Sequence, residues 1–109
     1  MPRHEFGIMQ FPPENGKEYI DYEPEKYGCI SVDDEYILRI IIKLKIIKCF
    51  HNSTDNPKFG LNYYGITLIP PESLGNFTDI VMDIKALSEL TALLEQARRE
   101  GKFVIHFGI

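Results

Sequence analysis

Residues 85–108 carry the pattern that most restricts the fold, because a helix there runs directly into a strand. Apolar residues recur at helical spacing, and this stripe consists of Leu87, Leu90, Leu94 and Ala97. Gly101 follows in the position that commonly ends a helix. In the strand, Phe103, Ile105 and Phe107 share one face, and Val104 and His106 share the other. This pair of elements predicts helices layered on a sheet, and we expect the strand at 102–108 to pair within that sheet.

The preceding elements alternate between short strands and helices. We expect strands at 6–11, 46–51 and 61–69, the last two forming a hairpin, and helices at about 34–45 and 71–84. This order predicts an α+β fold with a small mixed or antiparallel sheet of three to four strands and about three helices packed on one face. A length of 109 residues suits one domain, so we expect residues 1–109 to fold as a single domain.

Two segments allow more than one interpretation. Residues 12–30 are rich in proline, glycine, tyrosine and acids, which predicts an irregular segment or one that hides an edge strand at 19–22. Ser31, with Asp34 three positions later, is typical of a capped helix start. The β-branched run at 40–42 favours a strand instead. The boundary between helix and strand within 40–48 therefore stays open.

The charge distribution is uneven. The net charge is −4, but residues 14–35 hold eight acids and two lysines, so this segment is −6 and the remainder is +2. Nucleic acid requires clustered lysine and arginine, so we expect no nucleic-acid partner. An acidic segment instead favours solubility or a basic protein partner.

The sequence predicts a cytoplasmic protein. No apolar stretch typical of an export signal follows the first residues, and no segment is apolar over the length of a membrane helix. We therefore expect no membrane partner. In a reducing compartment Cys29 and Cys49 are expected to be free thiols.

The first functional hypothesis is a non-catalytic module that binds a basic protein through the acidic segment and exposed tyrosines. Tyrosine is common at interfaces because its ring is apolar and its hydroxyl is polar. The candidate binding residues are Glu23, Glu25, Asp33, Asp34, Tyr63 and Tyr64. Antitoxin and immunity proteins offer an analogy, in size and charge alone, since some are small acidic chains that cap a basic toxin. A homodimer is compatible with this hypothesis.

The second hypothesis is a site for a small molecule or metal, or a minor enzymatic activity, built on histidine. Its candidate residues are His51, Glu72 and His106. Cys49 and His51 share a strand face, but such neighbours lie roughly 6–7 Å apart, too far for direct proton transfer. The sequence holds no zinc-type spacing, phosphate-binding glycine loop or nucleophile elbow, so we predict no cofactor, no metal and no catalytic residue.

Overall fold

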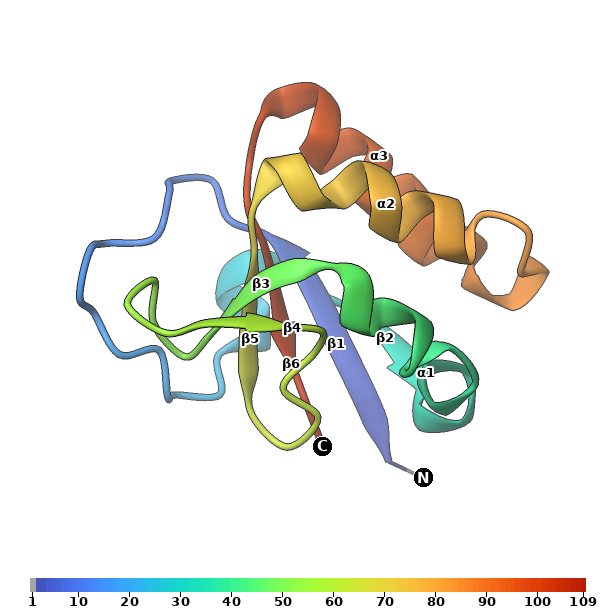
Figure 1. Cartoon of the computed structure of the whole chain (residues 1–109), viewed down its shortest axis with the longest axis horizontal. Coiled ribbons are helices and arrows are strands. Elements are labelled where there is room, and N and C mark those ends of the chain that lie inside the picture. The colour runs from blue at the N-terminus through green and yellow to red at the C-terminus, as the bar shows by residue number, and fades with distance from the viewer. Residues whose placement is uncertain (1) are drawn as a thin grey trace.

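The computed structural model describes residues 2–109, which form one antiparallel sheet of six strands. Across the sheet the strands run in the order β2 (Ile30–Asp33), β1 (Arg3–Ile8), β6 (Val104–Phe107), β5 (Ile66–Ile69), β3 (Lys48–His51) and β4 (Pro57–Phe59) (Figure 1). The predicted α+β class is confirmed, whereas the prediction of three to four strands is wrong. The strand at 102–108 does pair inside the sheet, since β6 lies between β1 and β5.

The two strands that the sequence did not reveal are the outer ones, β2 and β4. β2 has a single buried residue, Val32, and all three residues of β4 are exposed, so neither strand shows an apolar pattern. Ser31 lies in β2, where its hydroxyl accepts a hydrogen bond from Nε of Arg3, so it does not cap a helix. Pro57 begins β4, a position that an edge strand tolerates.

Three helices cover one face of the sheet: α1 (Asp34–Ile40), α2 (Pro71–Val81) and α3 (Ser88–Glu100) (Figure 1). Short 3-10 turns form η1 (Pro24–Tyr27), η2 (Lys43–Ile46) and η3 (Lys85–Leu87). The first helix was expected to continue to about residue 45, but it ends at Ile40. The β-branched residues at 40–42 disfavour a longer helix, and the chain passes through η2 into β3.

The buried side chains on the helical face form the main core. Phe6 of β1 meets Phe77 of α2 edge to face, with ring centroids 6.0 Å apart. The α3 residues Leu90, Leu94 and Ala97 join the same core, as the helical stripe in the sequence predicts. Complete burial of a phenylalanine or leucine side chain contributes about 1.5–3 kcal/mol.

The opposite face of the sheet carries a second, smaller core beneath the segment 9–29. Its buried members are Met9, Tyr19, Ile66, Leu68, Ile105 and Phe107. The segment bulges away from α2 and α3 (Figure 1) and contains η1 but no strand, so the alternative of an edge strand at 19–22 is wrong. Tyr19 holds it to the sheet, because its backbone N–H donates to the Asn52 carbonyl at 2.6 Å and its carbonyl accepts from Asn52 Nδ2 at 2.9 Å.

The predicted hairpin is present in part. β3 and β5 pair antiparallel, but β5 begins at Ile66, and residues 61–65 form a turn that returns to the sheet. Both cysteines are free, as expected: Cys49 is buried in the main core and Cys29 is half-buried.

Candidate functional site

The acidic segment divides into acids that the fold uses and acids that face solvent. Asp33 forms an ion pair with Arg3 at 2.5 Å across the β1–β2 pair. Glu23 lies 3.5 Å from Lys26, one helical turn along the chain. Glu25 is exposed. Of these candidate binding residues, Glu25 is thus the one most available to a partner.

An exposed patch of three large side chains lies within this acidic environment. Ile20, Tyr22 and Tyr64, here called the aromatic patch, are 71%, 65% and 78% exposed. They line a recess of about 130 Å³, to which Gly65, Ile66, Phe107 and Gly108 also contribute. The patch joins two segments that are distant in the sequence, the 9–29 segment and the turn at 61–65.

Acids surround Tyr22 in this patch. Its hydroxyl donates to Glu5 of β1, and that bond is the main cause that raises the pKa of Tyr22 to about 12, with burial and the charge of Glu25 adding to it. Tyr22 therefore stays protonated in any physiological buffer. Asp21, between Ile20 and Tyr22, is exposed. The patch thus has an apolar centre and an acidic border.

Sequence reasoning identified one member of the patch, Tyr64. The two adjacent tyrosines differ in exposure: Tyr64 is exposed and Tyr63 is half-buried, with their rings 4.8 Å apart. Ile20 and Tyr22 were missed as site residues. An isolated isoleucine among polar loop residues was the available signal, since it packs against nothing within its own segment.

A buried chain of hydrogen bonds occupies the helical face near the start of α1. Nε2 of His4 lies 2.8 Å from Oδ1 of Asp34, and Nδ1 of His4 lies 2.9 Å from Nε2 of His106. Nδ1 of His106 in turn lies 3.0 Å from the hydroxyl of Thr67. Tyr63 closes the outer end, donating to Oδ1 of Asp34 at 2.5 Å. His4, His106 and Thr67 have no exposed surface.

With both rings neutral, the partners fix each tautomer. The Asp34 carboxylate can only accept, so His4 carries its proton on Nε2 and accepts at Nδ1. His106 then donates from Nε2 and accepts at Nδ1, which requires the Thr67 hydroxyl to donate to it. The oxygen of Thr67 also accepts the backbone N–H of Asn62 at 2.8 Å. Each ring nitrogen of the two histidines and each hydroxyl of this network thus has a partner.

The pKa shifts follow from these contacts. Burial, then the neighbouring His4, lowers the pKa of His106 well below its usual 6.5. The hydrogen bond from Tyr63, then that from His4, lowers the pKa of Asp34. The bond to Asp34 raises the pKa of Tyr63 to about 12. The carboxylate is therefore held charged, and the inner imidazole is held neutral.

This network combines Asp34 and Tyr63, which sequence reasoning had proposed for partner binding, with His106 of the alternative histidine site. Its other two members, His4 and Thr67, were missed. For His4 the available signal was its place in an alternating segment, with Phe6 and Ile8 on the same face. An aspartate that orients a histidine is a feature of acid–base catalysis. Here, however, the second histidine nitrogen meets another buried imidazole, so neither ring reaches a substrate in this conformation.

His51 and Glu72, the other two candidates for a histidine site, do not line the recess at the aromatic patch. His51 aligns with Thr67 on the neighbouring strand, and Thr67 aligns with His106, so all three side chains share the helical face. Nε2 of His51 is bound to the Gly60 carbonyl at 3.0 Å. Glu72 is exposed in the first turn of α2. The histidines are thus occupied with the protein's own groups.

Within residues 2–109, no three or more histidine, cysteine and acidic side chains gather as they would around a metal ion. Nor does this described part of the chain contain a helix with the length and apolar character needed to cross a membrane. Comparisons of the chain with protein-family models, with curated proteins and with solved structures found no match.

Proposed function

We propose that this chain is a non-catalytic module that binds a basic protein through the aromatic patch and its acidic border. The observation that carries the proposal is the exposure of Ile20, Tyr22 and Tyr64 around one recess, the first two of them within the most acidic part of the sequence. Large apolar side chains gathered at the surface commonly mark an interaction site. Tyrosine is also among the residues that contribute most at interface centres.

Charge gives the partner its chemistry. Asp21 and Glu25 are exposed beside the patch, and Glu5 lies under Tyr22. Arginine side chains of a partner would pair with these carboxylates and stack on the tyrosine rings. Rim charges of this kind act mainly on the association rate, so binding should weaken as salt rises. The free thiols of Cys29 and Cys49 fit an encounter in the reducing cytoplasm, the compartment we propose.

Quantitative affinity capture from lysate of the source tests the proposal when variants are compared. Tyr22→Ser and Tyr64→Ser should each reduce recovery of the same basic protein at least tenfold, as loss of an interface anchor does. Ile42→Ser is the matched control, because Ile42 is 76% exposed but follows α1 on the helical side of the sheet. If both tyrosine variants capture as much of the basic protein as the original chain does, the proposal is refuted.

The acidic border needs its own comparison. Asp21→Lys with Glu25→Lys should reduce capture and its salt dependence, whereas Glu89→Lys with Glu95→Lys on exposed positions of α3 should not.

A homodimer is the alternative partner that the sequence allowed. Light scattering distinguishes it: a monomeric mass excludes self-association, and a dimeric mass abolished by Tyr64→Ser would replace the basic partner with a second copy.

A further inference from the structure

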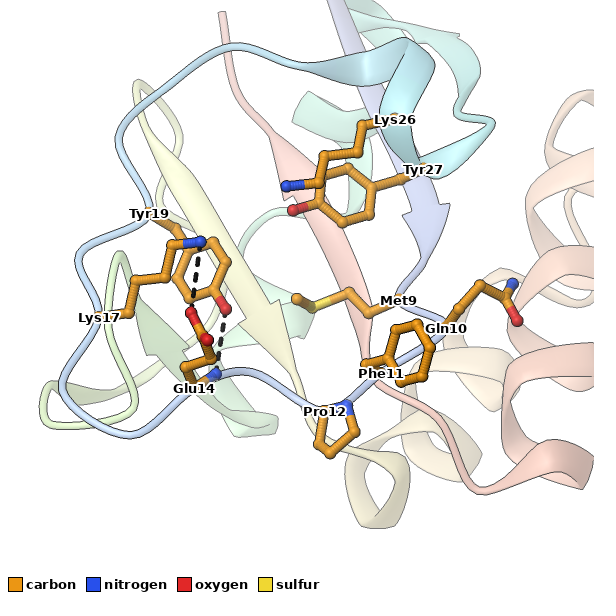
Figure 2. Close-up of a pocket in the computed structure, with 9 residues that line it drawn as sticks. All are labelled: Met9, Gln10, Phe11, Pro12, Glu14, Lys17, Tyr19, Lys26 and Tyr27. Carbon is orange, nitrogen blue, oxygen red and sulfur yellow. Dashed lines mark hydrogen bonds and ion pairs between the residues drawn. The ribbon is translucent and has the colours of Figure 1, made fainter.

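A larger hollow lies within the 9–29 segment, which supplies all the residues that line it. Its volume is about 510 Å³, within the range of about 300–1,000 Å³ typical of small-molecule sites. Figure 2 shows the nine side chains that line it: Met9, Gln10, Phe11, Pro12, Glu14, Lys17, Tyr19, Lys26 and Tyr27. This hollow, here called the loop cradle, takes no part in the aromatic patch proposed above.

The floor and walls of the loop cradle are apolar and aromatic. Met9 is buried at its base, and its side chain points into the middle of the hollow (Figure 2). Tyr19 and Tyr27 form two walls, and Phe11 lies at a third side although its side chain is 82% exposed. A phenylalanine exposed to water beside an apolar hollow buries apolar surface when a flat ligand enters, and this burial favours binding.

Two lysines bring positive charge to the same hollow. Nζ of Lys17 lies 4.9 Å from the ring centre of Tyr19, and Nζ of Lys26 lies 5.7 Å from that of Tyr27. Their carboxylate partners, Glu14 and Glu23, are 3.5 Å away. All four side chains are 44% exposed or more, and ion pairs of this kind contribute at most about 1 kcal/mol. Both ammonium groups can therefore turn to a ligand at small cost.

The tyrosine hydroxyls add polar groups at the walls. The Tyr19 oxygen accepts the backbone N–H of Glu14 at 3.1 Å, which leaves its own hydrogen free to donate. In Figure 2 the Tyr27 hydroxyl points into the hollow beside Nζ of Lys26. An apolar base with cations and hydroxyl donors at the edge matches a ligand whose ring is buried and whose anionic group stays near solvent.

We infer that the loop cradle binds a small planar aromatic anion, such as an aromatic carboxylate, with its ring over Met9 and its charge between Lys17 and Lys26. Tyr19 and Tyr27 hold the ring from the sides, and Phe11 covers it. The site is independent of the proposed protein partner, because Ile20, Tyr22 and Tyr64 do not line it.

The test uses 2-naphthoate as the probe and 2-naphthalenemethanol as its neutral counterpart, in titrations followed by amide NMR shifts. The naphthoate should shift the amides around Met9, Tyr19 and Tyr27 in a saturable way, and more tightly than the alcohol. Lys17→Gln with Lys26→Gln should weaken naphthoate about three- to tenfold and leave the alcohol unchanged, since only the charge interaction is lost.

Matched controls separate this site from general surface charge and from the aromatic patch. Lys43→Gln with Lys58→Gln removes two exposed lysines outside the cradle and should leave naphthoate binding unchanged. Tyr64→Ser should also leave it unchanged, whereas it should reduce capture of the protein partner. The inference is overturned if millimolar naphthoate shifts no cradle amide, or if the cradle and control lysine pairs weaken binding equally.

Discussion

Buried His106 should make the protein less stable as the pH falls below about 6.5, where an unfolded histidine takes up its proton. Burial and the neighbouring ring lower the pKa of His106 well below that value, so the folded state does not take up this proton. The same ring in the unfolded chain does take up the proton, so the unfolded state binds one proton more than the folded state.

The size of the effect follows from the missing proton. When His106 stays neutral in the folded state, the change from about pH 7.5 to about pH 5.5 lowers its contribution to the free energy of unfolding by about 1.4 kcal/mol. The sign is fixed by linkage: this stability is fully present above the unfolded pKa and is lost as the pH falls. For a small domain, about 1.4 kcal/mol is a sizeable part of the total.

Urea denaturation at the two pH values measures the difference, followed by far-UV circular dichroism or tyrosine fluorescence, since the chain has no tryptophan. The His106→Gln variant should be less stable at pH 7.5, because a flexible amide replaces a ring that packs on Phe6 and bonds to both His4 and Thr67, but it should lose about 1.4 kcal/mol less on acidification than the original protein. Between about pH 7.5 and about pH 8.5 the two should change in parallel, which serves as the control.

The ring signals of His106 provide a second, direct measurement that does not depend on the variant. They should show no titration from about pH 7.5 to about pH 5.5. A midpoint near 6.5 for this ring, or equal acid losses in the original protein and in a folded His106→Gln variant, would refute the reasoning.

Three further outcomes are expected. Tyr63→Phe removes the main cause that lowers the pKa of Asp34, so the NMR titration of that carboxyl should move upward and the stability it gives should be lost at a higher pH. Gly7→Ala should destabilise the protein by about 1–3 kcal/mol in urea, because the new Cβ would lie 2.7 Å from Sγ of Cys29. Burial raises the thiol pKa of Cys29 and Cys49 to about 12, so iodoacetamide should alkylate both far more slowly in the folded protein than in urea.

The elements with strong periodicity were predictable and the edge strands were not. The stripe at Leu87, Leu90 and Leu94 and the alternation in β6 both reflect burial on one face, so the sequence alone indicates them. β4 has three exposed residues, and therefore no apolar pattern exists to be recognised. Its position is determined by pairing with β3, so the residues of β4 alone do not indicate a strand.

The site residues were predicted less well, for a related reason. Charge and residue type suggested Asp33 and Asp34 as surface acids, and each instead has a partner brought to it by β1. In β1, Arg3 and His4 align with Asp33 and Val32 of β2, a register that no local sequence signal specifies. An acid near a helix start looks the same in the sequence whether it faces water or a buried imidazole.

The register of β6 with its neighbours β1 and β5 explains why a neutral histidine pair is compatible with this core. His106 aligns with Phe6 on one side and Thr67 on the other, so its ring lies among apolar groups with a single hydroxyl within reach. A leucine at this position would leave Nδ1 of His4 without its donor, at about 1–3 kcal/mol for a buried group, and would leave the Thr67 hydroxyl with only the bond that it accepts from Asn62. A charged group there would require a buried counterion, and the carboxylate of this network, Asp34, already accepts from His4 and Tyr63. Neutral imidazole satisfies the donor and the acceptor with one ring. The hydrogen bonds among Asp34, His4, His106 and Thr67 therefore connect α1, β1, β6 and β5 without requiring a charge on the central imidazoles. This uncharged centre is the part of the fold that acid should disturb first.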